Sequence, residues 1–141
     1  MRSVLDTNVV LSGFLWEGAP RQLWTAVLHD ELQLFTSEPL IAELQDVLAR
    51  PKCATRLHAI GLSAEYLLSH YCRMTSLVDP VLIPRLAPDP DDDVVIATAL
   101  SANANWIVTG DRTLLAVKGY EKIKILSVSE VLQVLGSERT K

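Results

Sequence analysis

Short apolar runs alternate with amphipathic stretches along most of the chain, and this alternation restricts the fold more than any other feature. Strand character is found at 3–6, 32–37, 106–109 and 122–127, with a short extended segment at 80–84. Helical patterns are predicted at 8–16, 21–30, 38–50, 63–77 and 127–135, on the acidic segment up to about Ala104, and as a short turn at 113–117. Strands alternating with helices are typical of parallel sheets covered by helices. The sequence therefore predicts an α/β sandwich around a mostly parallel sheet.

The helix predicted at 38–50 shows most clearly how its ends and its buried face are specified. Ser37 is an N-cap candidate, and Pro39 lies in the first turn, where a proline is tolerated. Ser63 is an equivalent cap candidate for the helix 63–77. An apolar stripe at helical spacing follows the first cap and consists of Leu40, Ile41, Leu44, Val47 and Leu48.

Length and composition fit a globular protein. With 141 residues and 49% hydrophobic residues, we expect one domain at 1–136 and a flexible tail at 137–141. Cys53 and Cys72 have no metal-like spacing and are expected to be free thiols. No apolar stretch approaches the ~20 residues that span a bilayer, and the N-terminus lacks a signal-peptide pattern. A soluble, cytoplasmic protein without a membrane partner is therefore expected.

The segment "DPDDDVVIATAL" at 89–100 concentrates like charge in a way that folding does not require. It places Asp89, Asp91, Asp92 and Asp93 directly before an apolar run. One aspartate suffices to cap the helix that follows, and Asp91 is the candidate for that role. Asp93 would then lie in the first turn, at the positive end of the helix dipole. Asp89 and Asp92 are interpreted as solvated residues or as supporting residues.

Three further acids are expected near the same edge of the sheet. Asp6 ends the first predicted strand, and Asp111 follows the strand 106–109 after one glycine. Ligands of open parallel sheets bind outside the carboxyl ends of the strands. Glu43 shares a helix column with Leu40 and Val47, where a carboxylate is unfavourable unless something neutralises it.

Each acid also has an ordinary structural interpretation: Asp6 can cap a helix, Asp111 can belong to a turn, and Glu43 can reach water. These interpretations do not predict the joint placement of Asp6, Glu43, Asp93 and Asp111. A carboxylate cluster without matching basic residues favours a hard divalent cation such as Mg²⁺ or Mn²⁺.

Other chemistries have weaker support. The three histidines share no ligand spacing, and neither a G-x-S-x-G motif nor a glycine-rich phosphate loop is present. The tryptophans are interpreted as core residues. Because the net charge is −4, any nucleic acid would have to be held by a local basic patch. The basic residues that could contribute are spread along the chain: Arg50, Lys52, Arg56, Arg73, Arg85 and Arg112.

In their order, "VLDTNVVLSGF", the acid in "IAEL", "DDDVVIATAL" and "WIVTGDRTLL" resemble the PIN-domain family from Val4 to about Val128. The likeness is greatest to the single-domain PIN toxins of type II toxin–antitoxin systems, the VapC group. That resemblance implies a three-layer sandwich with a mostly parallel five-stranded sheet flanked by helices, often in a homodimer.

The resemblance also implies a site. The family's acidic quartet falls on Asp6, Glu43, Asp93 and Asp111, with Asn8, Thr109 and Asp91 in supporting positions. Asp93 is favoured because Ile and Ala follow it at the third and fourth positions. Thr113 stands where many relatives carry a further Asp, so the implied site holds one or two Mg²⁺ or Mn²⁺ ions.

The function implied is a metal-dependent endoribonuclease with an RNA substrate and an antitoxin partner. Two other classes stay open. One is a non-catalytic binding module with the same fold. The other is a different Mg²⁺-dependent phosphohydrolase of the haloacid dehalogenase type, in which a second Asp would stand where Asn8 is found.

Overall fold

The computed structural model describes residues 1–81 and 90–139 of the chain. Asp89, Arg85 and most of the extended segment predicted at 80–84 lie outside these ranges. Within them, six strands form one sheet: β1 (Arg2–Leu5), β2 (Gln33–Thr36), β3 (Thr75–Leu77), β4 (Trp106–Val108), β5 (Gly119–Tyr120) and β6 (Ile123–Leu126). The helices of the same ranges are α1 (Thr7–Leu15), α2 (Ala19–Leu28), α3 (Glu38–Leu48), α4 (Pro51–Ile60), α5 (Ala64–Met74), α6 (Pro90–Ser101), α7 (Arg112–Val117) and α8 (Val128–Arg139).

The sheet has the strand order β3-β2-β1-β4-β6-β5, and only the pairing of β5 with β6 is antiparallel. From β1 the chain builds outward through β2 to β3 and then returns to add β4 on the other side of β1. The pair β1 and β4 is therefore the point at which the strand order reverses. Open α/β sheets bind their ligands at such a point, outside the carboxyl ends of the strands.

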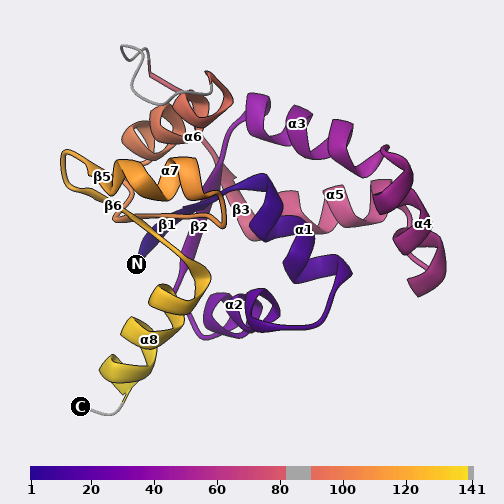
Figure 1. Cartoon of the computed structure of the whole chain (residues 1–141), viewed down its shortest axis with the longest axis horizontal. Helices are drawn as coiled ribbons and strands as arrows, with labels where there is room; N and C mark the ends of the chain where they lie inside the picture. The colour runs from indigo at the N-terminus through magenta and orange to yellow at the C-terminus, as the bar shows by residue number, and fades with distance from the viewer. Residues whose placement is uncertain (82–89, 140–141) are drawn as a thin grey trace.

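Two apolar clusters cover the two faces of the sheet, because side chains alternate along each strand. Leu5, Leu34 and Trp106 belong to one cluster, together with residues of α1, α2, α5 and α8. Val4 and Ile107 belong to the other, together with residues of α6 and α7. Figure 1 shows the same division, with α6 and α7 on one side of the strands and α1, α2 and α8 on the other. The predicted α/β sandwich with a mostly parallel sheet is confirmed.

The sheet has six strands in the described residues instead of the expected five. The sequence pattern did not indicate β3 or β5 as strands. The prediction of a helix over 63–77 is wrong for its last three residues. At Thr75 the backbone turns to φ −120° and ψ 157°, and Thr75 pairs with Leu34 of β2. The helix α4 was not predicted, because its buried face is formed by little more than Cys53 and Leu57.

Helix boundaries agree with most of the predicted caps. Ser63 caps α5 by accepting a hydrogen bond from the Tyr66 N–H. Ser37 occupies the N-cap position of α3, although its hydroxyl does not cap the backbone. The prediction of Asp91 as an N-cap is wrong, because α6 begins at Pro90 and Asp91 lies inside its first turn. At the other end of the chain, α8 extends to Arg139, three residues into the expected tail.

The tryptophans differ in burial. Trp106 is 4% exposed and lies in the core, as expected. Trp24 donates from its indole nitrogen to the Gly13 carbonyl, and a Cβ on Gly13 would lie only 2.4 Å from the Trp24 ring. Trp16, in contrast, is only partly buried.

Both cysteines are free thiols, Cys53 buried and Cys72 exposed, which confirms that expectation. In the described ranges, no helix has the length and apolar character needed to cross a membrane.

Candidate active site

Asp6 lies at the carboxyl end of the central strand and is 7% exposed. Its backbone N–H donates to the Val108 carbonyl of β4 at 2.9 Å, which fixes Asp6 beside the end of the neighbouring strand. It is also the N-cap of α1, since its Oδ1 accepts from the Thr7 N–H at 2.8 Å. The ordinary interpretation of Asp6 as a cap is thus correct, but it occupies only one of the two carboxylate oxygens.

Thr109, directly after β4, engages the other oxygen. Its hydroxyl donates to Asp6 Oδ2 at 2.7 Å and accepts from the Asp111 N–H at 3.0 Å. A hydroxyl has one proton, so this arrangement fixes the direction of both bonds. Thr109 is fully buried, and its own N–H donates to the Leu126 carbonyl of β6. This residue therefore joins Asp6, Asp111 and the ends of three adjacent strands.

Asp111 is held in a second capping arrangement. It is the N-cap of α7, and its Oδ1 accepts from the Thr113 N–H at 2.8 Å. The backbone of Thr113 therefore supplies a donor that orients Asp111. Asp111 is half-buried, so its carboxylate lies at the surface of the edge.

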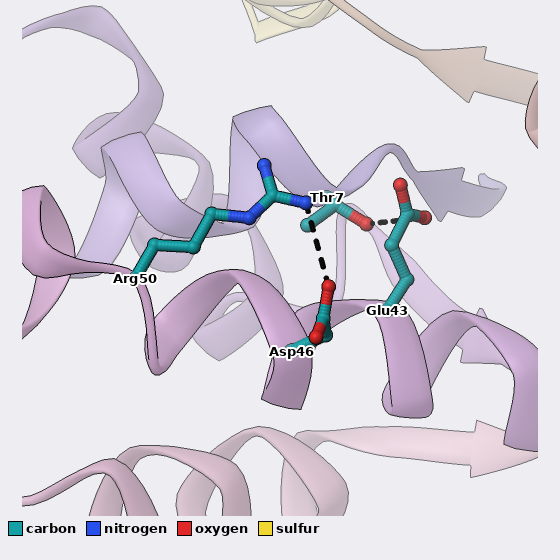
Figure 2. Close-up of polar contacts among 4 residues, drawn as sticks. All are labelled: Thr7, Glu43, Asp46 and Arg50. Carbon is teal, nitrogen blue, oxygen red and sulfur yellow. Dashed lines mark hydrogen bonds and ion pairs between the residues drawn. The ribbon is translucent and has the colours of Figure 1, made fainter.

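Glu43 comes from α3 and lies opposite the start of α1. Thr7 donates from its hydroxyl to Glu43 Oε2 at 2.9 Å, as Figure 2 shows. Glu43 is half-buried, with Leu40 buried one turn before it and Val47 half-buried one turn after it. The predicted stripe-edge position is observed, and a hydroxyl donor from a neighbouring helix stabilises the charge.

The helix α6 brings two buried aspartates to the same edge: Asp92 is 5% exposed and Asp93 is 9% exposed. Thr98 of α6 donates to the Val94 carbonyl, so the 2.8 Å contact between the Ser37 and Thr98 hydroxyls has Ser37 as its donor. This bond explains why Ser37 does not cap α3. It fixes α6 against the start of the helix that carries Glu43.

These elements enclose one polar pocket at the carboxyl edge. Its walls are formed by Asp6, Thr7, Asn8, Glu43, Val47, Arg50, Asp92 and Asp111. Three of the four predicted acids are therefore brought together, and Asn8 lies with them. Asp93 is buried but is not among the residues that line this pocket. The interpretation of Asp92 as a solvated residue is wrong, because it is buried and forms part of the wall.

The chemistry of this pocket fits a hard divalent cation. Its acids are oxygen donors, the type that Mg²⁺ and Mn²⁺ take from proteins. Among the described residues, however, no three His, Cys, Asp or Glu side chains converge closely enough to hold a metal ion. The carboxylates of Asp6, Glu43 and Asp111 each have an oxygen bonded to a nearby donor instead. The donor set is thus present, and its members are oriented by neighbouring N–H and hydroxyl groups.

Tyr71 offers no alternative as an acid or base. It packs edge-on against Phe14, with ring centroids 6.3 Å apart, and is 3% exposed. Burial, and secondarily the charge of Cys72, raise the pKa of the Tyr71 phenol well above its usual value. The phenol is therefore neutral at physiological pH.

Three polar residues of the pocket were not assigned to it from the sequence: Thr7, Arg50 and Asp92, the last of which was interpreted only as a solvated or supporting residue. Thr7 carried a usable signal, because it follows a strand-end acid and begins a helix, where a hydroxyl can face the site. Arg50 lies past the end of α3, and its side chain extends back along that helix toward Thr7 and Glu43 (Figure 2). Its place in the pocket depends on the turn between α3 and α4, which sequence periodicity does not give.

Comparison with known proteins agrees with the sequence resemblance. A family model described as the PIN domain matches residues 2–113. A search of curated proteins gave no match. Among solved structures, a chain from the crystal structure of VapBC2 from Rickettsia felis, bound to a DNA fragment from their promoter, has a similar fold. The TM-score is 0.59 at 14% sequence identity, covering 90% of this chain and 98% of that one.

Proposed function

The chain belongs to the PIN domain family, and from that premise we propose that it is a divalent-metal-dependent endoribonuclease, the toxin of a toxin–antitoxin pair. The observation that carries the proposal is the polar pocket at the ends of β1 and β4, with Asp6, Glu43, Asp92 and Asp111 in its wall. Buried like charges are unfavourable unless they are neutralised, and their position is the one where open parallel sheets bind ligands.

In this proposal, Asp6, Glu43, Asp93 and Asp111 would hold Mg²⁺ or Mn²⁺, as one or two ions, and Asp92 would add a further carboxylate from the pocket wall. When bound, such a cation supplies a water of lowered pKa and charge stabilisation at the phosphoryl and leaving oxygens.

The chain's own residues would then act by orientation. Thr109 holds the carboxylate of Asp6 through its hydroxyl, and Thr7 does the same for Glu43. The Thr113 N–H holds Asp111. Asn8 is exposed at the pocket and offers an amide to the substrate. Partners that orient the ligands of a metal are typically important for its affinity and for activity.

The structural neighbour comes from a VapBC2 assembly bound to promoter DNA. By that likeness we propose an antitoxin protein as the partner of this chain, a homodimer as its assembly and the cytoplasm as its location. RNA as the substrate follows from the same family likeness.

A non-catalytic binding module is the second candidate, and one observation favours it. In the described part of the chain, the acids do not already converge into a metal-holding group. The two candidates differ in a simple observable, since only the nuclease cleaves RNA in a metal-dependent way.

The test is cleavage of an end-labelled RNA pool by the purified protein in Mg²⁺ or Mn²⁺ and in EDTA. Asp6→Asn and Asp111→Asn are purified in parallel, and Asp30→Asn is the matched control. Asp30 lies after α2 and is exposed, so the control makes the same chemical change away from the pocket. We expect metal-dependent cleavage by the wild type and the control, with a loss of at least about a hundredfold in the two site variants. Equal cleavage by all four proteins would indicate a contaminating nuclease.

A further inference from the structure

The acidic pocket does not end at Arg50 but continues into a second hollow. Asn8, Val47 and Arg50 line both, so the two form one groove. Beyond these shared residues, the second hollow is lined by Leu11, Ser12, Trp16, Lys52 and Cys53. Asn8, Ser12 and Trp16 follow one another at four-residue spacing on α1 and its C-cap. At 1.5 Å per residue they extend about 12 Å along the groove.

Charge changes sign along this groove. The first part is acidic, whereas the described residues that line the second hollow include two cations, Arg50 and Lys52, and no acid. The net charge of the chain is −4, so this is a local basic patch on an acidic protein. A chain of this net charge needs such a local basic patch if it is to bind nucleic acid. The sequence alone did not show where the patch would lie.

Arg50 is available to a ligand. Among residues 1–81 and 90–139 it forms an ion pair with Asp46 at 3.4 Å, and the two side chains are 64% and 75% exposed. Exposed pairs of this kind contribute little to stability, so a stronger anion can replace Asp46. In Figure 2 the Arg50 side chain extends back along α3 toward Thr7 and Glu43, with Asp46 below its guanidinium. A phosphate bound there would lie directly beside the acidic pocket.

The start of α4 adds to the positive charge. Arg50 is its N-cap and Lys52 lies in its first turn, which contains no acid. The N-terminus of a ten-residue helix carries partial positive charge on its unbonded N–H groups. Two cationic side chains and the helix dipole therefore act on the same part of the groove.

Trp16 provides a flat apolar surface at the far end. It is half-buried, and the Lys52 ammonium lies 5.6 Å from the centroid of its ring. Arg56 holds the adjacent backbone, because its Nε donates to the Leu15 carbonyl at 2.6 Å. Aromatic rings next to cations are the usual elements with which proteins bind single-stranded nucleic acid, by stacking and phosphate contact.

We propose that this groove binds single-stranded RNA, with phosphates on Arg50 and Lys52 and one base stacked on Trp16, so that the next phosphodiester lies over the acidic pocket. The choice of RNA rests on the proposed function. Trp16 packs partly against the core, as the sequence predicted, and in this proposal its exposed part also positions the substrate. An acidic protein segment would use the two cations but would not need a stacking surface, so the Trp16 variants test for a bound base.

The test measures binding separately from cleavage. Fluorescence anisotropy of a labelled 12-nucleotide single-stranded RNA of mixed sequence is followed in EDTA, against the salt concentration. The variants are Arg50→Gln/Lys52→Gln and Trp16→Leu, with Trp16→Phe as the conservative aromatic change. The matched control is Lys122→Gln/Lys124→Gln, which removes the same charge from two exposed lysines around β6. Circular dichroism melts confirm that each variant is folded.

We expect the Arg50/Lys52 double variant to bind at least tenfold more weakly, with a salt slope smaller by about 1.4, or 0.7 for each lost phosphate contact. Trp16→Leu should bind about tenfold more weakly and Trp16→Phe within about threefold, since a stacking surface remains. RNA should also quench tryptophan fluorescence in the wild type and not in Trp16→Phe. The control should bind like the wild type.

Two results would overturn the inference: an unchanged salt slope in the Arg50/Lys52 variant, or equal affinity of Trp16→Leu and the wild type. If cleavage persists in that case, the proposed function stands and the groove is elsewhere. If RNA binds through these residues but no metal supports cleavage, the inference stands and the nuclease proposal fails.

Discussion

The two ends of the same strands are built on opposite principles. At the amino end of β1, the Arg2 N–H donates to Asn105 Oδ1 at 2.9 Å, and the Asn105 N–H donates back to the Arg2 carbonyl at 2.7 Å. The Arg2 guanidinium donates twice to the Ala102 carbonyl and covers the Phe35 ring at 4.2 Å. At this end the Arg2 guanidinium therefore contacts only neutral groups in the described residues, a carbonyl and an aromatic ring, and it covers the edge of the sheet.

At the carboxyl end the same strands lead to Asp6 and Asp111, with Asp92 and Glu43 added from helices. Hydroxyls and backbone N–H groups orient these charges. The amino end is therefore built for stability, whereas the carboxyl end gathers acidic side chains in one pocket, where a bound cation would be stabilised. Mutations at the two ends should therefore separate stability from activity.

The largest expected effect on stability comes from metal at the carboxyl end. Mn²⁺ at about 100 times its Kd should raise the free energy of unfolding by about 2.7 kcal/mol, because it binds the folded chain only. Thermal melts in Mn²⁺ and in EDTA measure this. Asp6→Asn should lose the shift, and Asp30→Asn should keep it. Identical melting curves for the wild type at millimolar Mn²⁺ would rule out the metal site.

The second effect belongs to the amino end. Arg2→Ala removes both hydrogen bonds to the Ala102 carbonyl and the contact with Phe35, and it should lower the unfolding free energy by about 2 kcal/mol. Cleavage should be unchanged under conditions where the variant is folded. Urea denaturation measures the loss, and Arg73→Ala, at an exposed position, should change stability by less than about 0.5 kcal/mol. Reduced cleavage by folded Arg2→Ala would mean that the two ends are coupled.

The third effect concerns orientation within the site. Thr7→Val keeps the shape of the side chain but removes the hydroxyl that donates to Glu43, so stability should fall by about 1 kcal/mol. Mn²⁺ affinity should fall by about 10- to 100-fold, as for other residues that orient metal ligands. Thr113→Val is the matched control, because Thr113 bonds Asp111 through its backbone N–H. Calorimetric titration with Mn²⁺ measures the affinity of both variants. Equal Mn²⁺ affinity of Thr7→Val and Thr113→Val would contradict the role of Thr7.

How much of this the sequence predicted depends on the range of the interactions involved. Ser63 as a cap and the apolar stripe of α3 depend on residues within a few positions, and both were predicted. The strand β3 was missed because its three residues continue a helical pattern, and only pairing with β2 makes them extended. The acids at the ends of β1 and β4, in contrast, were predicted, because ligands of parallel sheets bind at the carboxyl ends of the strands.

The parts of the site that were not predictable depend on rotation and on turns. Adjacent residues of a helix differ in direction by about 100°, so the sequence alone could not decide which aspartate of α6 lines the pocket. Asp92 shares one helix face with the buried residues Val95, Ile96 and Ala99. Because that face packs against the sheet, the Asp92 side chain is buried too. The groove between Arg50, Lys52 and Trp16 exists only because α4 begins directly after α3, and α4 had no clear periodicity.

The smallest effect on stability is also the one that tests the carboxyl end most directly. Without metal, Asp93→Asn should leave the protein at least as stable as the wild type, although a charge at the start of α6 is lost. The loss of interaction with the helix dipole amounts to about 0.3–1 kcal/mol. Asp92 and Asp93 are adjacent and both buried, so removing one charge relieves repulsion between them, and we expect this relief to outweigh that loss. Cleavage should nevertheless be abolished.

Asp92→Asn is the natural companion of this variant, because it makes the same change one residue away, on the pocket wall itself. It too should be no less stable without metal and should cleave poorly. Melting and cleavage must be measured on the same preparations, since a structural role would lower stability and leave the rate intact. Wild-type cleavage by Asp93→Asn together with none by Asp92→Asn would assign the ligand to Asp92 and shift the motif by one residue. A clear loss of stability in both metal-free variants would show that the acids of α6 stabilise the fold, and the contrast between the two ends of the sheet would then be wrong.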